Sequence, residues 1–181
     1  EVVIRSGERQ AAGAFRIVPF KIPHDALEPV GYVIEDSCGR RVGVVSDIGT
    51  CSRLAWGRLR DLDVLTLETN HDLKMLRDGP YPWHLKQRVA GRFGHLSNVD
   101  AAEGIRELLS ERLQWIVLYH LSEINNLPAL AVEAVSEILA SEGSSARLCV
   151  SCQSEPTGWM PVARNDAQSP ATATSTAAAD G

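Results

Sequence analysis

The sequence lacks the features that mark membrane proteins, exported proteins and disulfide scaffolds. No apolar run approaches the roughly 20 residues that a helix needs to span a bilayer, so we expect no membrane span. No positively charged leader with an apolar core opens the chain, so we expect no export. Cysteine is scarce, with four residues at irregular positions, which argues against a disulfide framework and favours the reducing cytoplasm.

Positive charge is also scarce over the chain as a whole. The 181 residues include 18 Lys and Arg against 23 Asp and Glu, for a net charge of -5. This balance excludes a protein that coats nucleic acid through a broadly basic surface, although it leaves room for a local basic site. With 44% hydrophobic and 23% charged residues, the composition is that of an ordinary globular protein.

The two cysteines Cys149 and Cys152 form one Cys-x-x-Cys pair near the end of the patterned sequence. A structural zinc site takes four ligands, and no second pair of soft ligands follows. Two thiols at the end of a last strand are therefore favoured over zinc or redox chemistry.

Strand and helix patterns alternate and predict an α/β layered fold. We expect strands at 14–20, 30–35, 41–46, 63–68, 115–120 and 147–150. We expect helices at 52–60, 71–77, 83–93, from 98 onward and at 129–141. The turn residues Asp36 to Gly39 predict a hairpin between the second and third strands, and Asn98 is a candidate cap for the helix that it precedes.

The patterned region predicts one domain over residues 1–154. Residues 155–181 lose this pattern, become rich in Ala, Ser and Thr, and are predicted to be a disordered tail. The first residue is Glu1 rather than Met, directly before an apolar run, so we expect that the amino terminus is a cut and not a start.

Three polar side chains stand where predicted strands end. They are His24, Asp47 and His120. In layered α/β folds, sites gather at the carboxyl ends of strands, and imidazole and carboxylate are common ligands of zinc, manganese and iron. Each residue taken alone is more simply a hydrogen-bonded strand end, so the metal-site interpretation depends on all three together.

A locally basic stretch runs from Lys74 to Arg92, with five basic residues against one acid. Basic groups hold phosphate and aromatic rings stack on bases, so this stretch is a candidate substrate-binding surface. Its candidate residues are Lys74, Arg77, Tyr81, Trp83, Lys86 and Arg88. The alternative is a solvated helix face without a ligand.

Six ordered blocks of sequence carry a resemblance to a known family. They are His24 to Ile34, Val44 to Gly49, Leu67 to Asp72, Gly79 to Trp83, Gly94 to Asn98 and His120 to Asn126. Over about residues 14–139 the chain resembles the C-terminal half of a metallo-β-lactamase-fold hydrolase, in the YycJ/WalJ-like branch proposed to be DNA exonucleases. It is more distantly similar to the tRNA 3′-processing ribonuclease Z. The implied fold is α/β, half of an αββα sandwich, with a mixed sheet and flanking helices.

The resemblance implies a role for each matching residue. His24 corresponds to a ligand of a first metal ion, Asp47 to a carboxylate bridging two ions, and His120 to a ligand of the second. His95 corresponds to a catalytic histidine beside the scissile phosphate, and Asp47 is grouped with it as catalytic. The implied cofactors are two divalent ions, zinc or manganese with iron as a further candidate. The implied substrate is nucleic acid, with DNA favoured over RNA.

One motif of the family is missing. Its members carry His-x-His-x-Asp-His in the N-terminal half, and no His-x-His occurs in this sequence. The first 18 residues are too few to hold that half, so the chain is either a fragment of a longer product or a degraded copy. Two functions follow: an incompletely liganded part of a phosphodiesterase that is inactive alone, or a non-catalytic half-domain that binds a partner or nothing. The sequence encoded directly upstream of Glu1 would distinguish these two functions.

Overall fold

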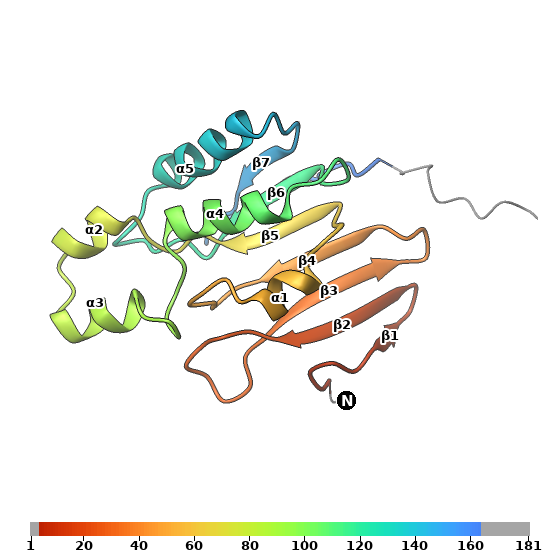
Figure 1. The fold of residues 1–181 in the computed structure, drawn as a ribbon, viewed down its shortest axis with the longest axis horizontal. Helices are drawn as coiled ribbons and strands as arrows, with labels where there is room; N and C mark the ends of the chain where they lie inside the picture. Colours follow the sequence, from red (N-terminus) through yellow and green to blue (C-terminus); the bar gives the residue numbers. More distant parts are fainter. Residues whose placement is uncertain (1–3, 164–181) are drawn as a thin grey trace, which may run out of the picture.

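The computed structural model describes residues 4–163, which form one sheet with helices along one face and at one end (Figure 1). The strands are β1 (Gln10–Ala12), β2 (Phe15–Lys21), β3 (Val30–Asp36), β4 (Arg41–Val45), β5 (Val64–Glu68), β6 (Trp115–Tyr119) and β7 (Arg147–Val150). The helices are α1 (Arg53–Arg58), α2 (Leu73–Asp78), α3 (Trp83–Val89), α4 (Asn98–Leu108) and α5 (Pro128–Ser141).

The sheet is mixed, as predicted, with strands in the order β1-β2-β3-β4-β5-β6-β7. Strands β1 to β4 pair antiparallel, and β4 to β7 pair parallel. The predicted β3–β4 hairpin is present, and its turn is closed by the Asp36 carboxylate, which accepts from the backbone N–H of Cys38 and Arg40, both at 2.9 Å. Strand β1 was not expected from the sequence, because its three residues show no apolar alternation.

The cap of α4 differs from the prediction. Ser97, not Asn98, is the N-cap residue, and its side chain accepts from the backbone N–H of Asp100. Asn98 is instead buried and forms side-chain hydrogen bonds with Asn126. Both residue types cap helices well, so the choice depends on a partner that is distant in the sequence.

The hydrophobic core lies between the sheet and the helices α1, α4 and α5 (Figure 1). Side chains alternate along a strand, so every second residue faces this core. On β5 these are Leu65 and Leu67, and on β6 Ile116 and Leu118, all fully buried. They pack with buried residues of the helices: Ala55, Trp56, Ala101, Ala102, Ile105, Leu108, Ala131, Val135, Ile138 and Leu139.

The segment after β7 contacts the amino-terminal end of β6. The indole N–H of Trp115 donates to the carbonyl of Pro161 at 2.9 Å, and the Gln114 side chain bonds both backbone groups of Ala163. Residues 155–163 contain no helix or strand, and the rest of the predicted tail lies outside the described residues. Within residues 4–163, no helix has both the length and the apolarity to cross a membrane.

The strand register brings several chain segments to one edge of the sheet. Val45 of β4 lies opposite Leu67 of β5, which lies opposite Leu118 of β6. These three strands are parallel, so they end at the same edge, and β2 runs in the same direction. The residues that follow each strand therefore meet there.

Candidate metal centre

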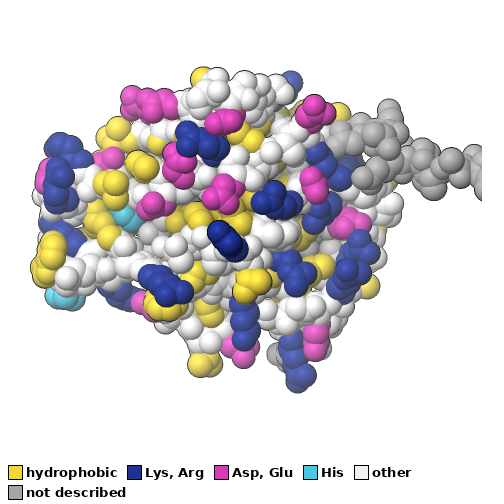
Figure 2. Space-filling view, in the orientation of Figure 1, with side chains coloured by type: hydrophobic (Ala, Val, Ile, Leu, Met, Phe, Trp, Pro, Cys, Tyr) yellow, Lys and Arg dark blue, Asp and Glu magenta, His cyan; other side chains and the backbone are white. Residues whose placement is uncertain are grey.

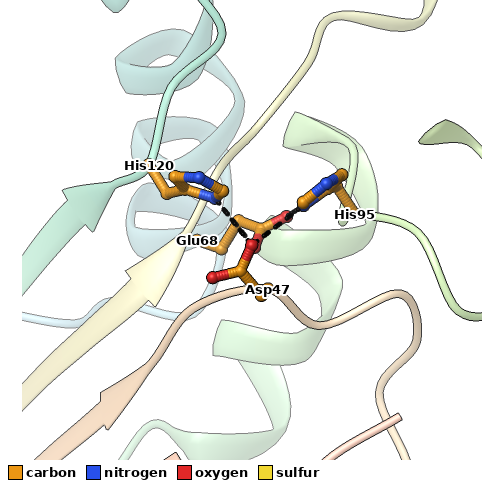
Figure 3. A group of neighbouring side chains, drawn as sticks. All are labelled: Asp47, Glu68, His95 and His120. Atoms are coloured by element: carbon orange, nitrogen blue, oxygen red, sulfur yellow. Dashed lines mark hydrogen bonds and ion pairs between the residues drawn. The ribbon is translucent and has the colours of Figure 1, made fainter. Parts of the chain in front are cut away.

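Asp47 lies at the centre of this edge, two residues beyond β4. Its backbone is left-handed, with φ at 55°, an unfavourable conformation that is found mostly at turns and functional sites. Its Oδ1 lies 3.8 Å from a ring nitrogen of each of three histidines, which are His24, His95 and His120. Figure 3 shows the carboxylate between the imidazoles of His95 and His120. Carboxylate and imidazoles thus converge from loops far apart in sequence.

His24 is held in one orientation by its neighbouring loop. Its Nδ1 lies 3.0 Å from the carbonyl oxygen of Gly94, and since a carbonyl only accepts, Nδ1 carries the proton. This leaves Nε2 as the ring nitrogen with a free lone pair. Nε2 lies 3.4 Å from Asp25 Oδ1 and 3.8 Å from Asp47 Oδ1, so it faces the acidic centre of the site.

Glu68, the last residue of β5, lies beneath the histidines and is fully buried. One carboxylate oxygen contacts Nδ1 of His95 at 3.0 Å, and the other contacts Nδ1 of His120 at 3.3 Å. The backbone N–H groups of Leu96 and Ile48 donate to the same two oxygens. Burial acts to raise the pKa of Glu68, but the hydrogen bonds from the two histidines outweigh it and lower that pKa.

The two histidines on Glu68 also lie against each other. Their ring centroids are 5.3 Å apart, and those of His24 and His95 are 5.2 Å apart. His120 has a left-handed backbone, with φ at 56°. The hydrogen bond to Glu68 is the main reason that its pKa is raised.

The donor set suits a divalent metal ion. Potential ligand atoms of Asp47, Glu68, His95 and His120 all lie within 4.8 Å of one another. Glu68 already accepts four hydrogen bonds, so its two oxygens are occupied in orienting the imidazoles of His95 and His120. Asp47 and the imidazoles remain, and zinc, manganese and iron all accept such nitrogen and oxygen donors.

Comparison with known proteins gives the family. Exodeoxyribonuclease YycJ of Bacillus anthracis is 34% identical over 137 residues, which are 76% of this chain and 52% of that protein. Exodeoxyribonuclease WalJ of Streptococcus pneumoniae serotype 2 is 36% identical over 130 residues, 71% of this chain and 48% of that protein. A structure of the metallo-β-lactamase fold protein YhfI from Bacillus subtilis matches with a TM-score of 0.60 and 15% identity, covering 83% of this chain and 52% of that one.

The chain is a YycJ/WalJ-like protein with the metallo-β-lactamase fold. The resemblance carried by the six sequence blocks is thereby confirmed, and so is the α/β fold class. No family model matches the chain. The chain spans about half the length of the curated relatives that it matches.

In this YycJ/WalJ-like chain, the three residues predicted at strand ends lie together with His95, the residue that the resemblance adds. His24, His95 and His120 surround Asp47. The sequence prediction missed Glu68, although one feature pointed to it: a charged residue ends the otherwise apolar strand Val64–Glu68, and buried carboxylates are rare unless they have partners.

The predicted substrate-binding residues lie on and between α2 and α3, at one end of the molecule (Figure 1). Figure 2 shows Lys and Arg side chains over α2 at the left of the view, and a second group at the right. Lys74 and Arg77 both pair with Asp78, and the ammonium of Lys86 donates to the carbonyl of Arg77. Tyr81, between the two helices, is half-buried, and the indole of Trp83, the first residue of α3, is exposed.

Arg88 connects this basic surface to the site. Its Nε donates to Asp25 Oδ2 at 2.6 Å, and the other oxygen of Asp25 faces His24. This hydrogen bond is the largest cause of the lowered pKa of Asp25. Arg88 of α3 is therefore connected to His24 through the carboxylate of Asp25.

Proposed function

We propose that this chain supplies the carboxyl-terminal part of a metal-dependent phosphodiesterase that acts as an exonuclease on nucleic acid. The observation that carries the proposal is the placement of Asp47 Oδ1 at 3.8 Å from each of three imidazoles. The names of the curated relatives, exodeoxyribonucleases YycJ and WalJ, support DNA over RNA. We expect the protein to be located in the cytoplasm.

In this proposal Asp47, His24 and His120 hold the metal. Zinc or manganese is the expected ion, with iron as a further candidate, because mixed carboxylate and imidazole donors suit all three. When bound, two such ions would polarise a phosphate and lower the pKa of water enough to generate hydroxide near neutral pH. Asp47 is the expected bridge, since it lies between His24 and His120.

His95 is the proposed catalytic residue that meets the reacting phosphate. Its Nδ1 is engaged by the buried carboxylate of Glu68, which leaves Nε2 to hold or release a proton at the leaving oxygen. His95 is only 22% exposed, so a proton held there is shielded from bulk water.

The basic surface of α2 and α3 is the proposed binding site for the nucleic-acid backbone. Arg88 uses Nε for Asp25 and keeps its outer nitrogens for a phosphate near the metal. Lys74, Arg77 and Lys86 would add contacts farther out, with the rings of Tyr81 and Trp83 available for stacking on bases. Such contacts position a strand without reading its sequence.

The chain alone offers few donors for two ions. Three ligands, one of them shared, leave each ion with two protein donors, whereas catalytic zinc normally has three and a water. We therefore infer that a further segment, the N-terminal half-domain of the fold, completes the site. Weak metal affinity and negligible activity are expected for this chain alone.

The experiment compares the chain alone with a polypeptide that adds the sequence encoded directly upstream of Glu1. Metal content and release of nucleotides from single-stranded and duplex DNA and RNA are measured on both. The proposal predicts that metal binding and DNA cleavage appear together in the longer polypeptide, and that His95→Ala removes cleavage while metal content stays. Cleavage by the longer polypeptide that survives His120→Ala would show that this chain does not supply the catalytic site. A start codon at the position of Glu1, together with no cleavage by either polypeptide, would favour the non-catalytic half-domain.

A further inference from the structure

We propose that Asn70, Asn98 and Asn126 are positioning residues that fix the loops carrying Glu68, His95 and His120. All three amides are buried, at 9%, 3% and 3% exposure. The inference rests on the proposed function, because it assigns these amides to the same metal site. None of them touches the reacting atoms in this assignment; they act through the residues that do.

Asn70 holds the backbone of His120. Its side-chain N–H donates to the carbonyl oxygen of His120 at 3.0 Å, and its backbone carbonyl accepts from the backbone N–H of Ser122 at 2.8 Å. His120 has the left-handed backbone that L-residues avoid. The two hydrogen bonds stabilise this turn from both sides, so they fix the direction in which the imidazole leaves the chain.

Asn98 and Asn126 form a reciprocal amide pair. Each side-chain N–H donates to the other's side-chain oxygen, at 2.8 and 2.9 Å. The Asn126 N–H groups also reach the carbonyl of Thr69 at 2.8 Å, and the backbone N–H of Asn98 donates to the carbonyl of His71 at 2.8 Å. The pair therefore joins the loop after β5, the start of α4 and the segment before α5.

Backbone hydrogen bonds also join these loops: the N–H of Thr69 donates to the carbonyl of Tyr119 at 2.9 Å, and that of Asn70 to the carbonyl of Leu96 at 3.0 Å. The three buried side-chain amides add to these backbone contacts and satisfy polar groups that the sheet and the helices do not reach. An amide supplies a donor and an acceptor without adding charge, which matters beside the carboxylates of Asp47 and Glu68. Outer partners of this kind orient metal ligands, and their loss commonly costs 10- to 100-fold in metal affinity.

Asn125 provides a matched control. It is the same residue type in the same segment, is 1% exposed, and its side-chain amide has no hydrogen-bond partner among the described residues. The variants are Asn70→Ala, Asn126→Ala and Asn125→Ala. Each is made in the polypeptide that adds the sequence encoded directly upstream of Glu1. Co²⁺ affinity is measured by absorption titration, and amide hydrogen exchange is measured without metal, under conditions where urea unfolding shows that the variant is fully folded.

We expect Asn70→Ala and Asn126→Ala to lower Co²⁺ affinity about 10- to 100-fold and Asn125→Ala to leave it unchanged. Without metal, exchange should accelerate at least tenfold at His120 to Ser122 in Asn70→Ala, while the amides of Leu65 and Ile116 stay protected. A merely structural role would instead accelerate exchange throughout the core.

Uniform acceleration, or a Co²⁺ affinity that matches Asn125→Ala, would overturn the inference. Failure of the unsubstituted longer polypeptide to bind Co²⁺ would reject the proposed metal site, and the local exchange pattern would then decide the inference alone.

Discussion

Replacing Glu68 with Gln tests the buried carboxylate beneath the histidines. Each of its oxygens accepts two hydrogen bonds: one from Leu96 N–H and His95, the other from Ile48 N–H and His120. A glutamine has the same shape but only one acceptor oxygen. In either orientation of the amide, its NH₂ group faces two donors, so two hydrogen bonds are lost and a backbone N–H is left buried without a partner.

The size of the loss follows from these contacts. Hydrogen bonds to a charged group stabilise by about 1.5 kcal/mol or more each, so the loss of two gives about 3 kcal/mol. The loss should depend on pH, because Glu68 raises the pKa of His120 above its ordinary value of 6.5. Protonated His120 therefore stabilises the metal-free fold below pH 6.5, and this contribution disappears as the pH rises through the raised pKa.

Urea denaturation of the metal-free chain at pH 6 and pH 9 measures both effects. We expect Glu68→Gln to lower the free energy of unfolding by about 3 kcal/mol at pH 6 and by less at pH 9. Glu137→Gln, on the exposed face of α5, is the control and should change it little. A loss under about 1 kcal/mol at pH 6, or equal losses at both pH values, would refute the assigned hydrogen bonds.

Three further changes probe the surroundings of the site. Burial lowers the pKa of His71, so the free energy of unfolding should fall as the pH drops below about 6.5. His71→Leu should therefore show a smaller drop in Tm between pH 7 and pH 5 than the unsubstituted chain. In Gly49→Ala the new Cβ would lie 2.6 Å from the backbone nitrogen of Gly94, which should cost about 2 kcal/mol in urea denaturation and weaken Zn²⁺ binding. Arg88→Gln should reduce the salt dependence of single-stranded DNA binding, measured by fluorescence anisotropy, by about 0.7 in log–log slope, whereas Arg53→Gln on α1 should not.

The strand-end residues could be predicted from sequence because parallel strands share an edge. His24, Asp47 and His120 each follow an apolar strand pattern, and the topology brings such positions together. The role of Glu68 could not be predicted in the same way. Its partners lie 27 and 52 residues away, so only the folded chain shows that this strand-terminal carboxylate is buried between two imidazoles.

Competition between two neighbouring residues explains why the predicted cap of α4 differs from the observed one. Ser97 and Asn98 both have side chains suited to capping a helix, and the reciprocal pair with Asn126 decides which of them caps α4.

In the basic stretch from Lys74 to Arg92, sequence alone shows a run of cations. The structure shows that Asp78 and Asp25 engage three of them, so their number overstates the free positive charge.

Zn²⁺ binding to Asp47→Asn tests the central claim most directly. Asn tolerates the left-handed backbone of this position and keeps its shape, but it removes the negative charge between the imidazoles. Asp61, whose φ is also 55°, gives the matched control Asp61→Asn. In the polypeptide extended upstream of Glu1, titration calorimetry should show Zn²⁺ affinity at least about tenfold weaker in Asp47→Asn and unchanged in Asp61→Asn. Equal affinity in both variants would contradict a metal centre built on Asp47.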